Sequence, residues 1–305
     1  MIKKLFFTGG GGFVAGNIIS QALRRDTKEW EIHAVDQYPL PLNFAGLKWH
    51  TFDLRDRKML WKTFNTVKPD VVIHTAAVSD IDYCEANQDI ALSVNVGVTA
   101  ELAGLCREFE KKMILFSTDT VFDGIKGWYT ENDEPGPVNF YGKTKVMAEK
   151  IVKETTTDWI IIRPSLVLGL PILDAGNSFL WKMVKALREN KEVSFPKEEI
   201  RTPIDVITLS RSILELAAGS FIGYLHLSGN DKLTRYDMAV GITGKLGCSL
   251  KLVVDKKPVI SIGRAPRPKD VSLNNNKAKQ TLSTPMLGLE EALDLIIAHR
   301  GDKEL

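Results

Sequence analysis

A run of four glycines, residues 9–12, is the feature that most constrains the fold of this chain. It lies between an apolar segment, residues 4–8, and a segment with helical periodicity, residues 13–25. Glycine loses more backbone freedom on folding than any other residue, so four in succession are costly unless the backbone must approach something closely. A strand, a glycine-rich turn and a helix in this order predict the first unit of an α/β domain.

Strand and helix patterns alternate through the first half of the chain. Short apolar runs predict strands, and apolar residues three and four apart predict helices. The predicted strands are residues 4–8, 31–36, 70–74, 112–117 and 159–164, and the predicted helices are residues 13–25, 58–67, 87–110 and 139–154. This alternation predicts an α/β fold, a Rossmann-type doubly wound parallel sheet, as a dinucleotide-binding domain over residues 1–169.

The pattern loosens in residues 170–305, which predict a smaller substrate-binding lobe. Helices are expected at 178–188, 205–218, 234–246 and 289–298, with a short strand at 224–227. We expect some of these elements to return to the Rossmann core. Residues 191–204 and 255–285 are rich in Pro, Lys and Asn and predict irregular structure.

The glycine run fits two spacings of a dinucleotide fingerprint. Gly10, Gly12 and Ala15 satisfy GxGxxG/A, and Gly9, Gly12 and Ala15 satisfy TGxxGxxG with Ala in the last place. Such a turn brings the backbone to a pyrophosphate, and the helix that follows offers free N–H groups to it. A plain tight turn is the alternative. The expected cofactor-binding residues here are Gly9, Gly10, Gly12, Phe13 and Val14.

Two acids are expected at the adenosine end of such a cofactor. Asp36 ends the second predicted strand, where a carboxylate can bind the ribose hydroxyls and repel a 2′-phosphate. No arginine follows it in Gln37-Tyr38, so the sequence favours NAD(H), with NADP(H) as the alternative. Asp53 and Leu54 are expected beside the adenine.

A second group of residues predicts proton transfer. Tyr141 and Lys145, in YGKTK, are four residues apart and share one face of a helix. An ammonium near a phenol favours the phenolate and lowers its pKa from about 10, which makes the phenol a usable proton donor near neutral pH. The YxxxK spacing is frequent by chance, and a surface tyrosine and lysine are the alternative.

The polar stretch FSTDTVFDG, residues 116–124, follows a predicted strand. Ligands of α/β sheets bind at the carboxyl ends of the strands, so Ser117, Thr118 and Asp119 are expected beside the cofactor. A hydroxyl there can donate a hydrogen bond to a substrate carbonyl. A helix N-cap or a turn is the alternative for these three residues.

In this order, these motifs resemble the extended short-chain dehydrogenase/reductase family. Residues 74–77, HTAA, occupy the place of that family's Asn-Ala-Ala segment. Asn95 matches its structural asparagine, and Arg163-Pro164 matches the strand that borders the nicotinamide. The further cofactor contacts that the resemblance implies are Ala76, Ala77, Asn95, Ser117, Arg163 and Pro164, together with Tyr141 and Lys145.

Within that family, the chain is most similar to dTDP-4-dehydrorhamnose reductases. STDTVFDG and YTENDEPGPVNFYGKTK resemble their motifs, as do later segments such as IRTPIDVITLS. Two features depart from that pattern. The segment PSLVLG, residues 164–169, lacks the tryptophan usual there, and Thr120 replaces a tyrosine.

The resemblance implies an NAD(P)-dependent reductase of a nucleotide-linked 4-keto sugar. Tyr141 would donate a proton to the developing alkoxide, Lys145 would hold the nicotinamide ribose, and Thr118 would position the carbonyl oxygen. The sugar would lie between the sheet and the carboxyl-terminal lobe. The residues expected to contact it are Asp119, Phe122, Arg201 and Thr202.

Two other functions fit the same motifs. A nucleotide-sugar 4-epimerase would use the same tyrosine and lysine with tightly held NAD. A non-catalytic regulatory subunit would also resemble this group, as the β subunit of methionine adenosyltransferase does. Consumption of NADH by a keto-sugar distinguishes a reductase from both alternatives.

The net charge and the cysteine content narrow the classes of function that remain. The net charge is +2, from 40 basic and 38 acidic residues, which gives no electrostatic case for nucleic acid or a membrane surface. The three cysteines show no zinc spacing. No signal peptide and no apolar run of membrane-spanning length is expected, so we expect a cytoplasmic protein. The resemblance implies a homodimer formed through helices.

Overall fold

A seven-stranded parallel sheet forms the centre of the computed structural model, which describes residues 2–24, 30–40, 44–172, 178–255 and 264–300. All its neighbouring strands pair in parallel. In spatial order the strands are β11 (Gly223–Leu227), β6 (Trp159–Pro164), β5 (Lys112–Phe116), β4 (Val71–His74), β1 (Lys3–Thr8), β2 (Trp30–Asp36) and β3 (Leu47–Thr51).

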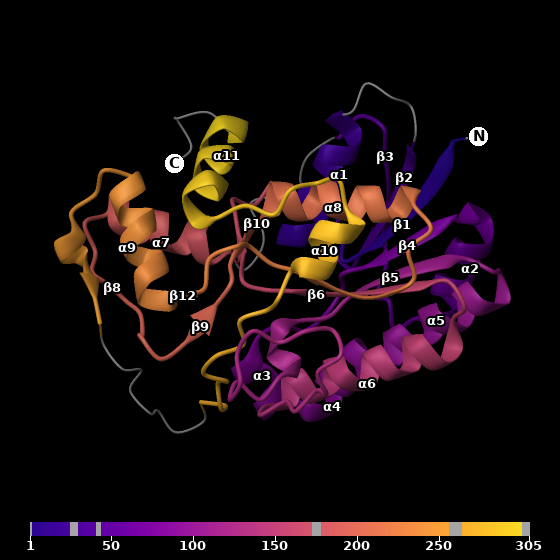
Figure 1. Cartoon of the computed structure of the whole chain (residues 1–305). Helices are drawn as coiled ribbons and strands as arrows, with labels where there is room; N and C mark the ends of the chain where they lie inside the picture. Colours follow the sequence, from indigo (N-terminus) through magenta and orange to yellow (C-terminus); the bar gives the residue numbers. More distant parts are fainter. Residues whose placement is uncertain (1, 25–29, 41–43, 173–177, 256–263, 301–305) are drawn as a thin grey trace.

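Helices cover both faces of this sheet (Figure 1). On one face lie α1 (Phe13–Arg24), α8 (Val206–Ala218) and α10 (Asn276–Thr281). On the other lie α2 (Arg57–Val67), α5 (Thr99–Glu108) and α6 (Phe140–Thr155). Alternate residues of β1 enter the two cores, Leu5 and Phe7 on the α1 side and Phe6 on the α2 side, as expected for a strand buried on both faces. The predicted doubly wound α/β fold is confirmed.

One strand of the sheet was not predicted. β3 lies at the sheet edge beside β2, and none of its residues is fully buried. A half-exposed edge strand carries too few apolar residues to give a strong pattern. The predicted end of the first helix, Arg25, lies outside the described residues.

The predicted helix 87–110 is a succession of α4 (Gln88–Ala91), a π-helical segment (Leu92–Val98) and α5. Contrary to expectation, the stretch Gln88–Glu108 is long and apolar enough to cross a membrane by length and composition, with a mean hydropathy of 1.3. Core helices of soluble proteins pass the same test. Here α5 packs against α6, and its side chains Leu102 and Cys106 lie in the core.

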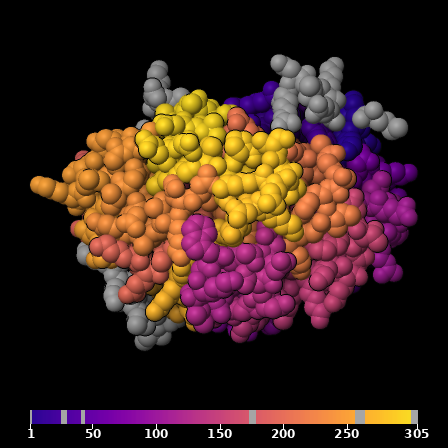
Figure 2. Space-filling model, viewed as in Figure 1, coloured from indigo at the N-terminus to yellow at the C-terminus, as the bar shows by residue number. Residues whose placement is uncertain are grey.

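The second half of the chain divides between the sheet and a smaller lobe. β11 extends the sheet beyond β6, and α8 packs along α1. The lobe has its own apolar core, to which α7 (Phe179–Arg188), α9 (Arg235–Lys245) and α11 (Leu289–Arg300) contribute. In Figure 2 the last segments of the chain, in yellow, lie between the orange lobe and the magenta segments on this face.

Short strands occur in the lobe, and some of them lie in the segment 191–204, where irregular structure was predicted. Two-residue ladders hold together segments that are far apart in sequence, and such strands are too short to show periodicity. The pairs are β7 (Val167–Leu168) with β10 (Ile204–Asp205), β9 (Ile200–Arg201) with β12 (Leu233–Thr234), and β8 (Val193–Ser194) with β13 (Val253–Val254). Of the predicted irregular segment 255–285, residues 256–263 lie outside the described residues, and the remainder contains α10.

Candidate active site

Two adjoining cavities lie over the carboxyl ends of the strands. The first, of about 610 Å³, spans the ends of β1, β2 and β3. The second, of about 660 Å³, lies over β5 and β6 and reaches the lobe. Both are lined by Gly9, Gly12, Thr75 and Ala77, so they form one continuous cleft around the glycine turn.

The glycine turn requires glycine where the backbone is closely approached. Gly9 has φ +69°, and a Cβ added there would lie 2.8 Å from the Cα of Ala76. The helix α1 then begins at Phe13, and its first residues line the second cavity. The turn therefore presents bare backbone and a helix N-terminus to the cleft, which fits a pyrophosphate.

Gly11, and not the predicted Gly10, lines the first cavity. A Cβ on Gly10 would lie 2.8 Å from that of Ala34 and 2.9 Å from the ring of Trp49, so Gly10 faces the protein interior and lines neither cavity. Gly11, which the fingerprint left without a role, lines the first cavity. Its N–H donates a hydrogen bond of 3.0 Å to Asp36.

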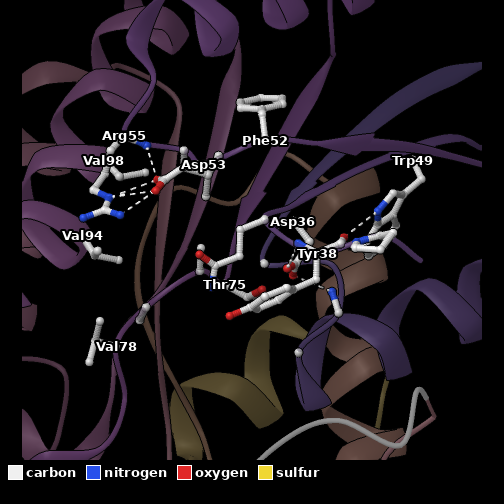
Figure 3. A pocket seen from close by; sticks show the side chains of 18 residues that line it. Asp36, Tyr38, Trp49, Phe52, Asp53, Arg55, Thr75, Val78, Val94 and Val98 are labelled. Carbon is white, nitrogen blue, oxygen red and sulfur yellow. Dashed lines mark hydrogen bonds and ion pairs between the residues drawn. The ribbon is translucent and has the colours of Figure 1, made fainter. Parts of the chain in front are cut away.

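Acidic side chains line the first cavity as expected (Figure 3). Asp36, at the end of β2, also accepts a 3.2 Å hydrogen bond from the N–H of Tyr38. Asp53 is paired with Arg55, whose guanidinium donates to both carboxylate oxygens at 2.6 to 3.1 Å and lowers the pKa of that carboxyl. Leu54 lines the same cavity.

The three candidate catalytic residues meet in the second cavity. Tyr141 and Lys145 come from α6, which begins where Asn139 caps it by accepting a 2.9 Å hydrogen bond from the N–H of Gly142. Thr118 lies two residues beyond the end of β5 and caps a short 3-10 turn. Both the proposed catalytic use and the alternative cap role of Thr118 are therefore compatible with its position.

The pKa of Tyr141 differs from the sequence prediction. Burial raises it above its ordinary value, the carboxylate of Asp119 raises it further, and a hydrogen bond with Thr118 opposes both effects. Lys145 does not give the expected lowering, because burial of this lysine, which is 4 % exposed, lowers its own pKa to about 8, and it has therefore lost its charge at the pH where the phenol would ionise. Tyr141 is thus held in the protonated form at neutral pH.

Lys145 lines the second cavity, and its ammonium group has no hydrogen-bond or ion-pair partner among the described residues. Glu149 favours its charged form only through space. An ammonium in this setting gains by binding oxygen atoms of a ligand.

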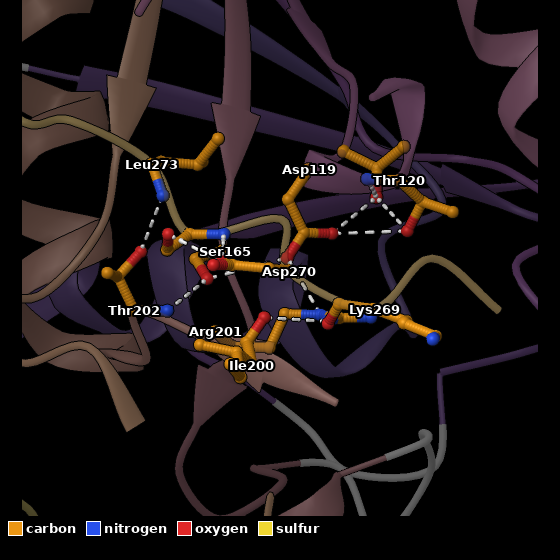
Figure 4. A network of polar contacts seen from close by, with 11 residues as sticks. Asp119, Thr120, Ser165, Ile200, Arg201, Thr202, Lys269, Asp270 and Leu273 are labelled. Carbon is orange, nitrogen blue, oxygen red and sulfur yellow. Dashed lines mark hydrogen bonds and ion pairs between the residues drawn. The ribbon is translucent and has the colours of Figure 1, made fainter. Parts of the chain in front are cut away.

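Asp119 is the centre of a buried polar network (Figure 4). The hydroxyls of Thr118, Thr120 and Ser165 donate to its carboxylate at 3.3, 3.1 and 3.4 Å. The Nε of Arg201 lies 3.3 Å from its Oδ2. Burial raises the pKa of Asp119, and Arg201 opposes that rise. Asp119 and Arg201 both line the second cavity, as predicted for contacts to a substrate.

Arg163 lies away from both cavities. Its guanidinium makes a bidentate ion pair with Glu149 at 3.0 and 2.7 Å, and the hydroxyl of Ser117 donates to the same carboxylate at 2.5 Å. Arg163 therefore ties α6 to the sheet, whereas Ser117 and Pro164 border the second cavity.

Three further residues that were predicted to bind the cofactor or the substrate instead contact other parts of the protein. Asn95 bonds to the backbone of Val78 and to Thr144, which fixes the π-helical segment against α6. Phe122 is fully buried in a small apolar cluster. Thr202 is fully buried and accepts a 3.1 Å hydrogen bond from the N–H of Leu273. None of these three lines either cavity.

One group of residues in the second cavity was not predicted from the sequence. They lie in the lobe, in short or irregular segments where single charged residues carry no recognisable spacing. They are Glu199, Arg235, Arg264 and Arg267.

The comparisons with known proteins show the family of this chain. The family described as RmlD substrate binding domain matches residues 3–301. The chain belongs to this family. The resemblance to extended short-chain dehydrogenases/reductases of the dTDP-4-dehydrorhamnose reductase type is thereby confirmed.

Two relatives of this chain carry names that state different functions. The probable low-salt glycan biosynthesis reductase Agl14 of Haloferax volcanii is 28% identical over 97% of this chain and 98% of its own. The methionine adenosyltransferase 2 subunit beta of Rattus norvegicus is 29% identical over 95% of this chain and 87% of its own.

A solved structure supports the fold across the whole chain. The dTDP-4-dehydrorhamnose reductase of Bacillus anthracis, solved in complex with NADP, superposes with a TM-score of 0.86 at 24% identity. The match covers 98% of this chain and 100% of that one. At this identity the likeness speaks for the fold alone.

Proposed function

We propose that the chain is an NAD(P)H-dependent reductase of a nucleotide-linked 4-keto sugar. The observation that carries this proposal is the meeting of Thr118, Tyr141 and Lys145 in one cavity that adjoins the glycine turn. The first cavity would hold the adenosine half of the cofactor and the second the nicotinamide and the sugar. A bound reduced nicotinamide supplies hydride to the sugar carbonyl carbon.

The residues of this chain provide orientation and a proton. Thr118 donates a hydrogen bond to the carbonyl oxygen and fixes its place beside the phenol. Tyr141, held protonated by its surroundings, donates its proton to the alkoxide that develops at that oxygen. Lys145 binds the nicotinamide ribose hydroxyls, and its positive charge stabilises the phenolate that proton transfer leaves behind.

Asp36 favours NAD(H) as the cofactor. Its carboxylate lines the first cavity, where it can accept hydrogen bonds from ribose hydroxyls and repel a 2′-phosphate. NADP(H) is the alternative, and the similar Bacillus anthracis structure holds NADP. We place the reaction in the cytoplasm and expect the protein to act as a homodimer.

A second candidate is a non-catalytic regulatory subunit. The 29% identity with methionine adenosyltransferase 2 subunit beta favours it specifically. A protein of this kind would bind the cofactor in the same cleft, co-purify with a partner enzyme and turn over no keto-sugar. A 4-epimerase, in contrast, would convert its substrate without net oxidation of NADH.

Oxidation of NADH and NADPH tests the proposal. The purified chain is assayed spectrophotometrically with dTDP-, UDP- and GDP-linked 4-keto sugars. We expect one of them to oxidise NADH, and Tyr141→Phe to remove that activity while cofactor binding persists. Tyr83→Phe, at an exposed tyrosine of α3 (Ile81–Ala86), is the matched control. Full activity in Tyr141→Phe would refute the assigned proton donor.

A further inference from the structure

The lobe side of the second cavity holds more positive charge than its acids neutralise. Three of its four arginines form ion pairs and the fourth forms none with the described residues. The pairs are Arg201 with Asp119 at 3.3 Å, Arg264 with Glu199 at 3.3 Å and Arg267 with Asp82 at 2.8 Å. The fourth arginine is Arg235, whose buried Nε has no hydrogen-bond partner in the part of the chain that the structure describes.

The local fold fixes Arg235 in this position. It is the first residue of α9, after the N-cap Thr234, whose hydroxyl accepts a 3.0 Å hydrogen bond from the N–H of Asp237. β12 pairs antiparallel with β9, and the backbone N–H of Arg235 continues this ladder to the carbonyl of Glu199 at 2.8 Å. Leu233 lies opposite Arg201 in this ladder, and residues two apart along a strand share a face. Arg235, two residues after Leu233, therefore lies on the same face as Arg201, and both line the second cavity.

Two aromatic rings lie close to the guanidinium of Arg235. Its Cζ lies 4.2 Å from the ring centroid of Phe179 and 5.8 Å from that of Phe195. Burial lowers the pKa of Arg235 to about 10, so the guanidinium stays charged at neutral pH. A guanidinium that is partly removed from water without a counter-charge is costly to the fold, and a ligand that supplies the counter-charge recovers this cost on binding.

We propose that Arg235 is an oxyanion-binding residue of the substrate cavity, where it holds a phosphate or carboxylate group of the substrate. This inference rests on the proposed function for the role of the cavity. Thr118 donates to Asp119, Asp119 pairs with Arg201, and Arg235 lines the same cavity, so one ligand can place a carbonyl at Tyr141 and an anion at the lobe. The planar guanidinium suits a bidentate contact to either oxyanion.

Equilibrium binding of simple anions tests this inference apart from turnover. Inorganic pyrophosphate and glucuronate are titrated calorimetrically into the full chain with saturating NAD present, which occupies the glycine turn. We expect Arg235→Met to weaken binding about ten- to a hundredfold, and Arg235→Lys to weaken it less. Arg211→Met, at an exposed arginine of α8, removes the same charge and is expected to change nothing.

The two probes distinguish the source of the anion. Arg235-dependent binding of pyrophosphate assigns the site to the diphosphate of a nucleotide sugar, and Arg235-dependent binding of glucuronate alone assigns it to a sugar carboxylate. Failure of the wild-type chain to bind either anion, or equal affinities of wild type and Arg235→Met, overturns the inference. Thermal unfolding is measured alongside, and a large loss of stability in both Arg235 variants would assign a structural role instead. Because these titrations need no keto-sugar, a failed reductase assay leaves their outcome readable.

Discussion

The carboxylate of Asp36 accepts a 3.0 Å hydrogen bond from the backbone N–H of Gly11. This contact joins the end of β2 to the glycine turn that follows β1. It fixes the carboxylate at the wall of the first cavity, with a second N–H, from Tyr38, on its other oxygen. The acid that we propose to select the cofactor is therefore held in place before any cofactor binds, which reduces the entropy lost on binding.

Asp36→Ser should shift cofactor preference from NADH toward NADPH. The change removes the charge that repels a 2′-phosphate and the acceptor for the ribose hydroxyls. We expect NADH binding to weaken about tenfold, or about 1.4 kcal/mol, while NADPH binding weakens less or improves. Titration of both cofactors by protein fluorescence measures this. Glu108→Gln, at an exposed acid of α5 that lines neither cavity, is the control, and equal losses for both cofactors in Asp36→Ser would contradict the role.

Glu149→Gln should strongly destabilise the fold. The change leaves the guanidinium of Arg163 buried without its counter-charge, at a site where both side chains are almost fully buried. Breaking one partner of such a pair costs about 3–5 kcal/mol of the free energy of unfolding. Urea denaturation monitored by circular dichroism measures the loss.

The same helix supplies a matched control for that experiment. Lys150 and Glu154 form an exposed pair, 3.9 Å apart, one turn further along α6. Glu154→Gln is expected to change the free energy of unfolding by less than about 0.5 kcal/mol. Similar losses for the two variants would mean that the interior pair contributes no more than a surface one.

The central sheet was predictable because it is buried on both faces. Strands such as β1 and β4 are short continuous apolar runs, and the glycine turn marks the first crossover. β3 was not predictable, since an edge strand has weak apolar patterning. The ladders of the lobe were missed because their pairing depends on contacts between distant segments, as in β9 with β12, and not on local sequence.

The site was predictable where a motif fixes geometry, and not elsewhere. Tyr141 and Lys145 share a helix face, so their spacing alone places them together. Arg163 was assigned to the cofactor together with Pro164 through the family resemblance, but successive strand residues point to opposite faces, and Arg163 turns away from the cleft while Pro164 borders it. Arg235 enters the cavity only through the tertiary packing of the lobe, which single-sequence patterns do not encode.

His74→Asn should reduce the loss of stability in acid. His74 is buried between the hydroxyls of Thr8, at 2.7 Å, and Thr99, at 2.9 Å, and burial lowers its pKa to about 3. As the pH falls below about 6.5 the unfolded chain gains a proton that the folded chain refuses, so the free energy of unfolding falls between about pH 6.5 and 3. One such histidine contributes about 1.4 kcal/mol per pH unit in that window.

Urea unfolding at pH 7 and pH 4.5 measures this contribution. We expect the difference between the two pH values to be smaller in His74→Asn than in the wild type by about 2 kcal/mol. His226, whose pKa burial also lowers to about 3, contributes a similar slope and remains in both proteins. An unchanged difference in the variant would mean that His74 takes up its proton in the folded state as readily as in the unfolded one.

Lys145→Met should stabilise the cofactor-free protein while it abolishes turnover. Burial lowers the pKa of Lys145 from 10.5 to about 8, so below pH 8 the fold bears the full cost of a buried ammonium. Between about pH 8 and 10.5 the unfolded chain holds a proton that the folded chain lacks, and the free energy of unfolding therefore rises with pH across that window. The variant should gain about 2–3 kcal/mol in free energy of unfolding at pH 7 and gain nothing near pH 10.5. Between these pH values its free energy of unfolding should show no slope from this residue.

Thermal or urea unfolding at both pH values measures this, with the exposed Lys150→Met on the same helix as control. If Lys145→Met lost both activity and stability at pH 7, the role of Lys145 would be to stabilise the fold at α6. If the variant gained stability and lost activity, the charge of Lys145 serves ligand binding at a cost to stability, as proposed.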